Sequence, residues 1–320
     1  MARRFYILGL LVVLSGGCGP GFEGPEKVED LRVLGVRADP PEIIYLAARP
    51  VEATTELSFL VVNPVAPTVP VDWRLTGCVV RDDGRCEAAT EILLAEGRDP
   101  PGEIIAAVTL PKDLIQASFD ADLYFGLFGA AVWIQGVIVQ AGEPEARFIK
   151  SVLLSPDAGI GRTANTNPWL DEIRTGDEDL EEPLSLDRDG IWRVAAGETI
   201  RLLPVSPEET REAYVVPAFT YEGTLDPEAI AGGEIPDFTF TTEALDEELV
   251  FHFYTSIGDL STASKAEGIN VILESDQDRE DRDLSVNFKA PKEPGAGTLW
   301  FVVDDERGGV GWLTIPVVVE

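Results

Sequence analysis

The chain lacks most of the side chains on which hydrolytic and metal chemistry depends. Its 320 residues include a single histidine, His252, and only three cysteines. No Gly-x-Ser-x-Gly elbow occurs, so we expect no serine nucleophile activated by a histidine base. Two cysteines, Cys78 and Cys86, flank the stretch VVRDDGR, and with one histidine they cannot supply a tetrahedral zinc set. We therefore predict no catalytic residues and no enzyme activity.

Basic residues are also scarce. The 25 Lys and Arg are outnumbered by 57 Asp and Glu, which gives a formal charge of −32. A polyanion of this strength repels nucleic acid, so DNA and RNA are excluded as partners. Disorder is excluded as well, because 45% of the residues are hydrophobic and the apolar positions are well patterned.

The N-terminal apolar run is too short to cross a membrane. Arg3 and Arg4 precede the ten apolar residues 5–14, whereas a spanning helix needs roughly 20. Small residues then lead to Cys18, which is the pattern of a secretory signal peptide over residues 1–17. The sequence LSGGC resembles the end of a bacterial lipoprotein signal, which implies that Cys18 carries the lipid and becomes the new N-terminus. Ordinary secretion with a free Cys18 thiol is the alternative.

The compartment follows from this anchor. Gly19, in place of an Asp after the cysteine, resembles lipoproteins that are exported to the outer membrane. We expect a lipid-anchored protein of the bacterial cell envelope whose partner is the membrane, through the acyl chains. Residues 18–30, rich in Gly, Pro and charge, are predicted to be the lipidated cysteine and a tether.

The rest of the chain predicts an all-β protein. Strand-length segments alternate apolar and polar residues and are separated by turns rich in Pro and Gly. The clearest inward-facing sets are Val71, Trp73 and Leu75; Phe251 and Phe253; and Leu284, Val286 and Phe288. This spacing predicts two tandem β-sandwich domains, over residues 31–155 and 191–320.

Two segments are less regular. The apolar stretch 123–139 contains Gly126, Gly129, Gly136 and Gln135, and we interpret it as two successive buried strands rather than a membrane span. Residues 156–190 hold turn chemistry and the acidic run TGDEDLEEP, and are predicted to be an acidic linker between the domains.

The closing segment 286–319 resembles the last three strands of immunoglobulin-like and PKD-like domains. It contains an aromatic-x-Ala-Pro strand end, a Gly-containing turn and an aliphatic strand before the final one. Residues 251–258 and 31–43 are similar to other strands of such sandwiches. The whole layout resembles two-domain envelope lipoproteins of myxobacterial type, which implies immunoglobulin-like folds and no catalytic residues.

Candidate sites are few. A disulfide between Cys78 and Cys86 is predicted across the Asp83-Gly84 turn, with two free buried thiols as the alternative. Weak calcium candidates occur in the run SDQDREDRD, where a solvated loop is the other interpretation. Their ligands would be Asp276, Asp278, Asp281 and Asp283. No other cofactor is expected.

Together these features predict a non-enzymatic lipoprotein that acts as a structural module or binds an envelope protein or polysaccharide. A calcium-assisted adhesin or scaffold is one alternative. An envelope glycoside hydrolase with a carboxylate pair is the other, because 57 acidic residues make chance pairs unavoidable.

Overall fold

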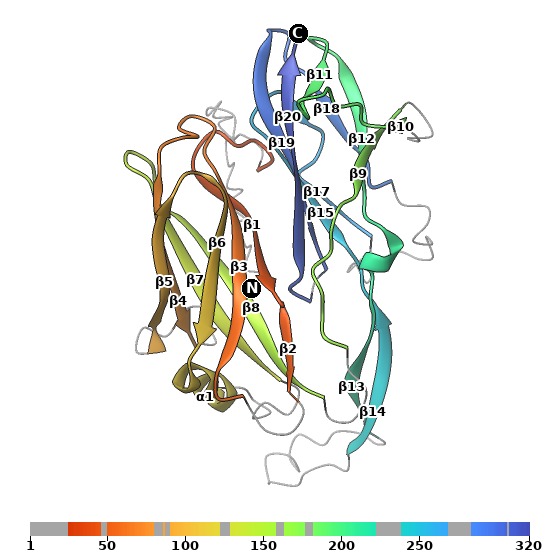
Figure 1. The fold of residues 1–320 in the computed structure, drawn as a ribbon. Coiled ribbons are helices and arrows are strands. Elements are labelled where there is room, and N and C mark those ends of the chain that lie inside the picture. The colour runs from red at the N-terminus through yellow and green to blue at the C-terminus, as the bar shows by residue number, and fades with distance from the viewer. Residues whose placement is uncertain are drawn as a thin grey trace, which may run out of the picture.

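The computed structural model describes two β-sandwiches that lie side by side (Figure 1). The residues described are 25–45, 50–79, 86, 90–121, 129–157, 163–176, 182–221, 238–267, 283–305 and 307–320. Within these ranges no helix has both the length and the apolar character needed to span a bilayer. The prediction of an all-β fold built from sandwiches is confirmed.

The N-terminal sandwich consists of two sheets, with strand orders β1-β3-β6 and β2-β8-β7-β4-β5. Most neighbouring strands are antiparallel, whereas β2 pairs with β8 in parallel. Its strands are β1 (Arg32–Asp39), β2 (Glu42–Tyr45), β3 (Ala53–Val62), β4 (Val71–Cys78), β5 (Ile92–Asp99), β6 (Gly102–Leu110), β7 (Ala130–Val139) and β8 (Ala146–Pro156).

Alternation along the strands builds this core. On β4, Val71, Trp73 and Leu75 point inward, as the sequence predicts, and the residues between them face solvent. Phe59 on β3 meets Trp73 edge to face, with ring centroids 5.6 Å apart. Burying each such aromatic side chain contributes roughly 1.5–3 kcal/mol. The core is therefore held between the two sheets by side chains far apart in sequence.

One helix and one long strand depart from the sequence prediction. Helix α1 (Lys112–Ala121) was not expected, and it buries Leu114, Ile115 and Phe119 against the sandwich. The stretch predicted as two buried strands contains a single described strand, β7, with residues 122–128 outside the described ranges.

The C-terminal sandwich has sheets of order β10-β9-β12-β18-β16 and β11-β20-β19-β15-β17. A separate two-stranded ribbon, β13-β14, extends from it (Figure 1). The elements are β9 (Glu172–Thr175), β10 (Glu182–Pro183), β11 (Trp192–Val194), β12 (Thr199–Val205), the 3₁₀ turn η2 (Glu208–Thr210), β13 (Ala213–Tyr221), β14 (Phe238–Asp246), β15 (Val250–Thr255), β16 (Asp259–Leu260), β17 (Ser264–Ala266), β18 (Val286–Lys289), β19 (Gly295–Asp304) and β20 (Val310–Val319).

The predicted linker 156–190 is in part a component of this second sandwich. Strand β9 pairs antiparallel with β12, and β10 pairs with β9. The physical reason is apolar burial, because Leu170 and Ile173 lie in the core of the C-terminal sandwich. The acidic composition of the linker does not prevent β9 and β10 from pairing as strands, because apolar residues of this segment can still face the core.

The two sandwiches pack sheet face against sheet face. Leu34, Leu60 and Val62 of the β1-β3-β6 sheet contact Trp300 and Val302 of β19 in a small apolar cluster. Strand β1 lies beside β20 (Figure 1). At Gly35 a Cβ atom would lie 3.2 Å from the ring of Trp312, so glycine permits this close approach.

The end of the predicted tether takes part in the same interface. Val28 is buried in the interdomain cluster. Its N–H donates to the carbonyl of Thr255 at 2.8 Å, and the N–H of Thr255 donates to Glu26 at 2.8 Å. Lys27 Nζ donates to the carbonyl of Gly258 at 2.7 Å. Residues 26–28 are thus fixed to the C-terminal sandwich before the chain enters the N-terminal one.

Candidate binding groove between the sandwiches

The predicted disulfide is present. Cys78, at the end of β4, is bonded to Cys86, and their Cα atoms lie 5.4 Å apart. Residues 80–85 between them lie outside the described ranges. The lipidation residue Cys18 also lies outside them, so its modification stays a prediction.

The calcium prediction can be followed at one of its four residues. Asp276, Asp278 and Asp281 lie outside the described ranges. Asp283 forms ion pairs with Arg201 at 2.9 Å and Lys265 at 3.6 Å. Partial burial opposes ionisation, but hydrogen bonds from Ser285 and Arg201 outweigh it and lower the pKa of Asp283. Its carboxylate is thus already neutralised by protein cations.

The only histidine is paired with an acid and not with a nucleophile. His252 lies on the outward face of β15, and its Nε2 is 2.8 Å from Oδ2 of Asp304. No hydrogen bond joins His252 to a described serine, threonine or cysteine. The side chain thus links two neighbouring strands, β15 and β19, through its contact with Asp304.

Several carboxylates come together at the junction of the two sandwiches. They surround an arginine and do not face each other across an open cleft. Arg307, in the β19–β20 turn, lies 3.0 Å from Glu42 of β2 and 2.6 Å from Glu247. Glu212 is 3.6 Å away, and the guanidinium stacks over Tyr214 at 4.2 Å. The side chains of Glu42 and Glu247 are 0% and 1% exposed. We call Arg307, Glu42, Glu212, Glu247 and Tyr214 the junction cluster.

Further polar bonds cross the same junction. Lys150 of β8 donates to the carbonyl of Gly308, and burial lowers the pKa of Lys150 from 10.5 to about 8. Asn167 donates to the carbonyl of Ala38 at 2.8 Å and accepts from the N–H of Val310 at 3.0 Å. These bonds, together with the apolar interface, fix one sandwich relative to the other.

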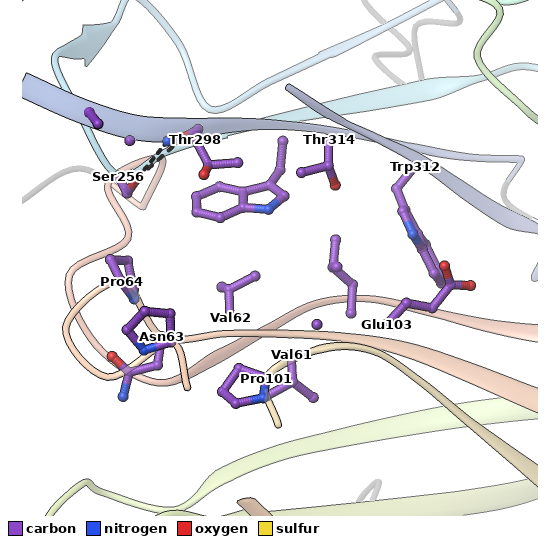
Figure 2. Close-up of a pocket in the computed structure, with 16 residues that line it drawn as sticks. Val61, Val62, Asn63, Pro64, Pro101, Glu103, Ser256, Thr298, Trp312 and Thr314 are labelled. Atoms are coloured by element: carbon purple, nitrogen blue, oxygen red, sulfur yellow. Dashed lines mark hydrogen bonds between the residues drawn. The ribbon is translucent and has the colours of Figure 1, made fainter. Parts of the chain in front are cut away.

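Where the two facing sheets diverge, they leave a groove with a volume of about 560 Å³. Figure 2 shows Val62, Pro64 and Pro101 on one side and Thr298 and Thr314 on the other. We call this the interdomain groove. Its lining residues are Leu60, Val61, Val62, Asn63, Pro64, Pro67, Pro101, Gly102, Glu103, Ser256, Ala296, Gly297, Thr298, Trp300, Trp312 and Thr314.

Strand pairing decides which side chains line the groove. On the outward face of β19 and β20, Trp300 lies directly opposite Thr314, and Val302 lies opposite Trp312. Both tryptophans therefore share one sheet face. On the other wall, Leu60 of β3 lies opposite Glu103 of β6. The groove is thus formed by two strand pairs that come from different sandwiches.

Charge is nearly absent from the groove, although the chain as a whole is strongly acidic. Among the described residues that line it, Glu103 is the one that carries a charge, and its carboxylate accepts from Arg37 at 3.0 Å. Arg37 also stacks over the ring of Trp312 at 4.8 Å. This stacking is a cation–π contact that holds the indole in place at one end of the groove.

Several polar groups of the groove are already engaged within the protein. Asn63 donates to Gln140 and accepts from the N–H groups of Val65 and Ala66. Ser256 Oγ accepts from the N–H of Thr298 at 2.9 Å (Figure 2). These residues shape the groove wall and are not available for a ligand.

Sequence reasoning did not find the groove. Trp300 and Trp312 lie at the domain interface. The available signal was alternation: both point away from the core residues Leu299, Phe301 and Ile315 of the same strands. An outward-facing tryptophan on a sheet indicates that this face is covered or binds a ligand. The sheet that covers it here, β1-β3-β6, is distant in sequence, so local patterns do not identify it.

A second hollow, of about 770 Å³, lies over the β4-β5 side of the N-terminal sandwich. Its charges are mixed: Arg98 pairs with Asp72 at 3.1 Å, and Arg147 pairs with Glu145 beside it. Opposite charges cancel across this exposed face, so it favours no particular ligand.

Comparisons with known proteins add little to this geometry. No protein-family profile matches the sequence, and no curated protein does. Among solved structures, red sea bream transglutaminase has a TM-score of 0.24 and 11% identity, covering 92% of this chain and 32% of its own. The native conformation of Escherichia coli alpha-2-macroglobulin has a TM-score of 0.23 and 10% identity, covering 92% of this chain and 16% of its own. The chain thus spans less than a third of either.

Proposed function

We propose that this protein is a non-enzymatic, lipid-anchored module of the bacterial envelope that binds an extended protein or polysaccharide segment. The interdomain groove is the observation that carries the proposal. It is concave, lined by two tryptophans and several prolines, and nearly uncharged in a chain of net charge −32. Ligand sites are typically apolar concavities with a few placed polar groups, and they occur preferentially between domains.

The fixed junction supports this use of the groove. The junction cluster and the apolar interface hold both walls in place before a ligand arrives. A preformed site avoids part of the ordering cost of binding. The same junction supports a structural role, because it holds the two sandwiches in a fixed orientation relative to each other.

The state of the titratable groups supports a non-enzymatic role. The buried carboxylates of the junction cluster face Arg307 and not the groove, and His252 is held by Asp304. A glycosidase needs two carboxylates that face each other across a substrate cleft. Among the residues lining the groove, Glu103 is the one carboxylate.

The anchor and the groove are tested together with three variants. Cys18→Ser removes the acyl-accepting thiol and is expected to release the chain from the membrane fraction. In this released chain, Thr314→Arg places a long cation on the exposed groove wall. Thr109→Arg places the same side chain on the exposed face of β6, outside the groove lining.

The assay is co-sedimentation with purified envelope material, quantified against protein concentration. We expect saturable binding by the Cys18→Ser chain and by its Thr109→Arg derivative, and at least a tenfold loss in Thr314→Arg. Retention of the Cys18→Ser/Thr314→Arg chain, which lacks both the acyl-accepting thiol and an open groove, in the membrane fraction would contradict the anchor. Equal binding by both arginine variants would contradict the groove.

A further inference from the structure

We infer that the ligand of the interdomain groove is a proline-rich peptide segment in the polyproline II conformation. The inference rests on the proposed function and specifies its ligand class. The groove's available hydrogen-bonding groups, its apolar walls and its lack of charge support this ligand class.

The available side-chain groups are two indole N–H groups, which only donate, and two hydroxyls, which donate and accept. The indole N–H groups of Trp300 and Trp312 make no hydrogen bond to a described residue. Neither indole nitrogen is fully buried, so both can be reached by a ligand. The hydroxyls of Thr298 and Thr314 likewise have no partner in the described part of the chain. Thr314 is exposed and stands directly across from Trp300 on the paired strands. One wall therefore offers four hydrogen-bond donors within two adjacent strands.

Glu103 is the described lining residue whose side chain only accepts, whereas the hydroxyls of Thr298 and Thr314 can accept as well as donate. The carboxylate of Glu103 is held by Arg37, and the carbonyl oxygen of Asn63 accepts from two backbone N–H groups. With two donor-only indoles and a carboxylate that is paired with Arg37, the groove suits a ligand that has more hydrogen-bond acceptors than donors. Sugar hydroxyls each carry a donor as well as an acceptor, so a glycan matches this surplus of donors less well than a ligand that only accepts.

A polyproline II segment has the matching chemistry. Its carbonyl groups make no internal hydrogen bonds and are fully available, and each proline lacks an N–H. Its conformation is set before binding, which lowers the entropic cost, and aromatic-lined grooves are the usual sites for it. Because neither proline nor the groove carries much charge, the acidic surface elsewhere does not oppose the encounter.

The walls fit pyrrolidine rings. Leu60, Val62 and Trp300 form an apolar floor, and Pro64 and Pro101 border it (Figure 2). The rim at Ala296 and Gly297 carries no large side chain. An extended chain can therefore lie close to the strand backbone there.

The test titrates decaproline into the Cys18→Ser chain by calorimetry and by tryptophan fluorescence. An alternating glycine–serine peptide of the same length and a neutral oligosaccharide serve as comparison ligands. Trp312→Phe keeps an aromatic ring under Arg37 but removes the indole donor. Thr314→Val removes a hydroxyl from an exposed, nearly isosteric side chain.

Two matched substitutions control for effects outside the groove. Trp169→Phe removes an indole that bonds Asp171 away from the groove, and Thr109→Val removes an exposed hydroxyl at the far part of β6. We expect each groove variant to weaken decaproline binding about threefold to tenfold, as the loss of one neutral hydrogen bond implies. The controls are expected to bind as the parent chain does.

Each other outcome overturns the inference in an identifiable way. Absence of saturable decaproline binding, or equal binding of the glycine–serine peptide, excludes a polyproline II ligand. Unchanged affinity in both groove variants excludes the groove as its site. If decaproline fails while groove-dependent binding to envelope material persists, the ligand class is wrong and the proposed function stands.

Discussion

Replacing Arg307 with methionine is expected to lower the free energy of unfolding by about 3–5 kcal/mol, the usual cost of removing one partner of a buried ion pair. Methionine retains much of the aliphatic stem but removes the charge and all the guanidinium donors. Glu42 and Glu247 then lose their shared cation while their side chains are 0% and 1% exposed. The variant should therefore lose stability because of charge and not because of volume.

The assay is urea unfolding at neutral pH, followed by circular dichroism, with Arg98→Met as the control. Arg98 is paired with Asp72, but both side chains are more than 60% exposed. An exposed pair of this kind contributes only about 0–1 kcal/mol. The difference between the two variants measures what burial adds to an arginine–carboxylate pair in this fold.

The pH dependence gives a second test of the same reasoning. Burial raises the pKa of Glu247 even with Arg307 present. A carboxyl with a raised folded-state pKa stabilises the fold below its unfolded-state pKa, and this contribution is lost as the pH rises through the folded-state value. Without Arg307 the pKa of Glu247 rises further, so the loss in Arg307→Met should shrink between pH 7 and pH 5.

The double variant Arg307→Met/Glu247→Gln should recover part of the lost stability, since it removes one of the buried charges. Two results would refute the reasoning. One is a destabilisation no larger than that of Arg98→Met. The other is a destabilisation that does not change with pH, which would indicate a packing defect and not uncompensated charge.

Two further predictions concern other features of the fold. Because burial lowers the pKa of Lys150 from 10.5 to about 8, the unfolded chain binds more protons over this interval, so wild-type stability should rise between pH 8 and pH 10.5. Lys150→Met should remove that rise, and equal slopes in urea titrations of both proteins would contradict this. Removing the disulfide by Cys78→Ala and Cys86→Ala should cost roughly 2–3 kcal/mol, from the chain-entropy relation for a closed loop with a sequence separation of 8. Thermal unfolding under reducing and oxidising conditions checks it, and an unchanged melting temperature would show that the closed turn adds nothing.

Much of the strand structure could be predicted from local patterns. Val71, Trp73 and Leu75 face the core because residues two apart lie on one side of a strand. The turn signals in residues 304–311 likewise predict the β19–β20 hairpin. The disulfide was accessible for the same reason, because its two cysteines flank one short turn.

Elements with weak local patterns could not be predicted. Helix α1 buries Leu114, Ile115 and Phe119, but ten residues give too few turns for a clear helical period. Strand β9 has four residues, and Ile173 is its buried one. Its identity as a strand depends on pairing with β12, which lies beyond it in the sequence.

The junction cluster and the groove depend on contacts that no local pattern specifies. Arg307 stands in a turn that indicates only a change of direction, yet its partner Glu42 belongs to the other sandwich. Trp312 and Trp300 alternate outward in the same way as a solvent-facing residue does. Which outward face becomes covered is decided when the sandwiches meet, so the groove is a property of their assembly.

Glu26 and Val28 precede the N-terminal sandwich in the sequence, but their hydrogen bonds to Thr255 attach them to the C-terminal sandwich. If the chain is suspended from Cys18, tension along the leading segment is delivered first to the domain that comes last in the sequence. The earlier domain then hangs from the same point instead of acting as a link in series. Tension on the anchor would thus load both halves in parallel, and the space between them would keep its width under strain.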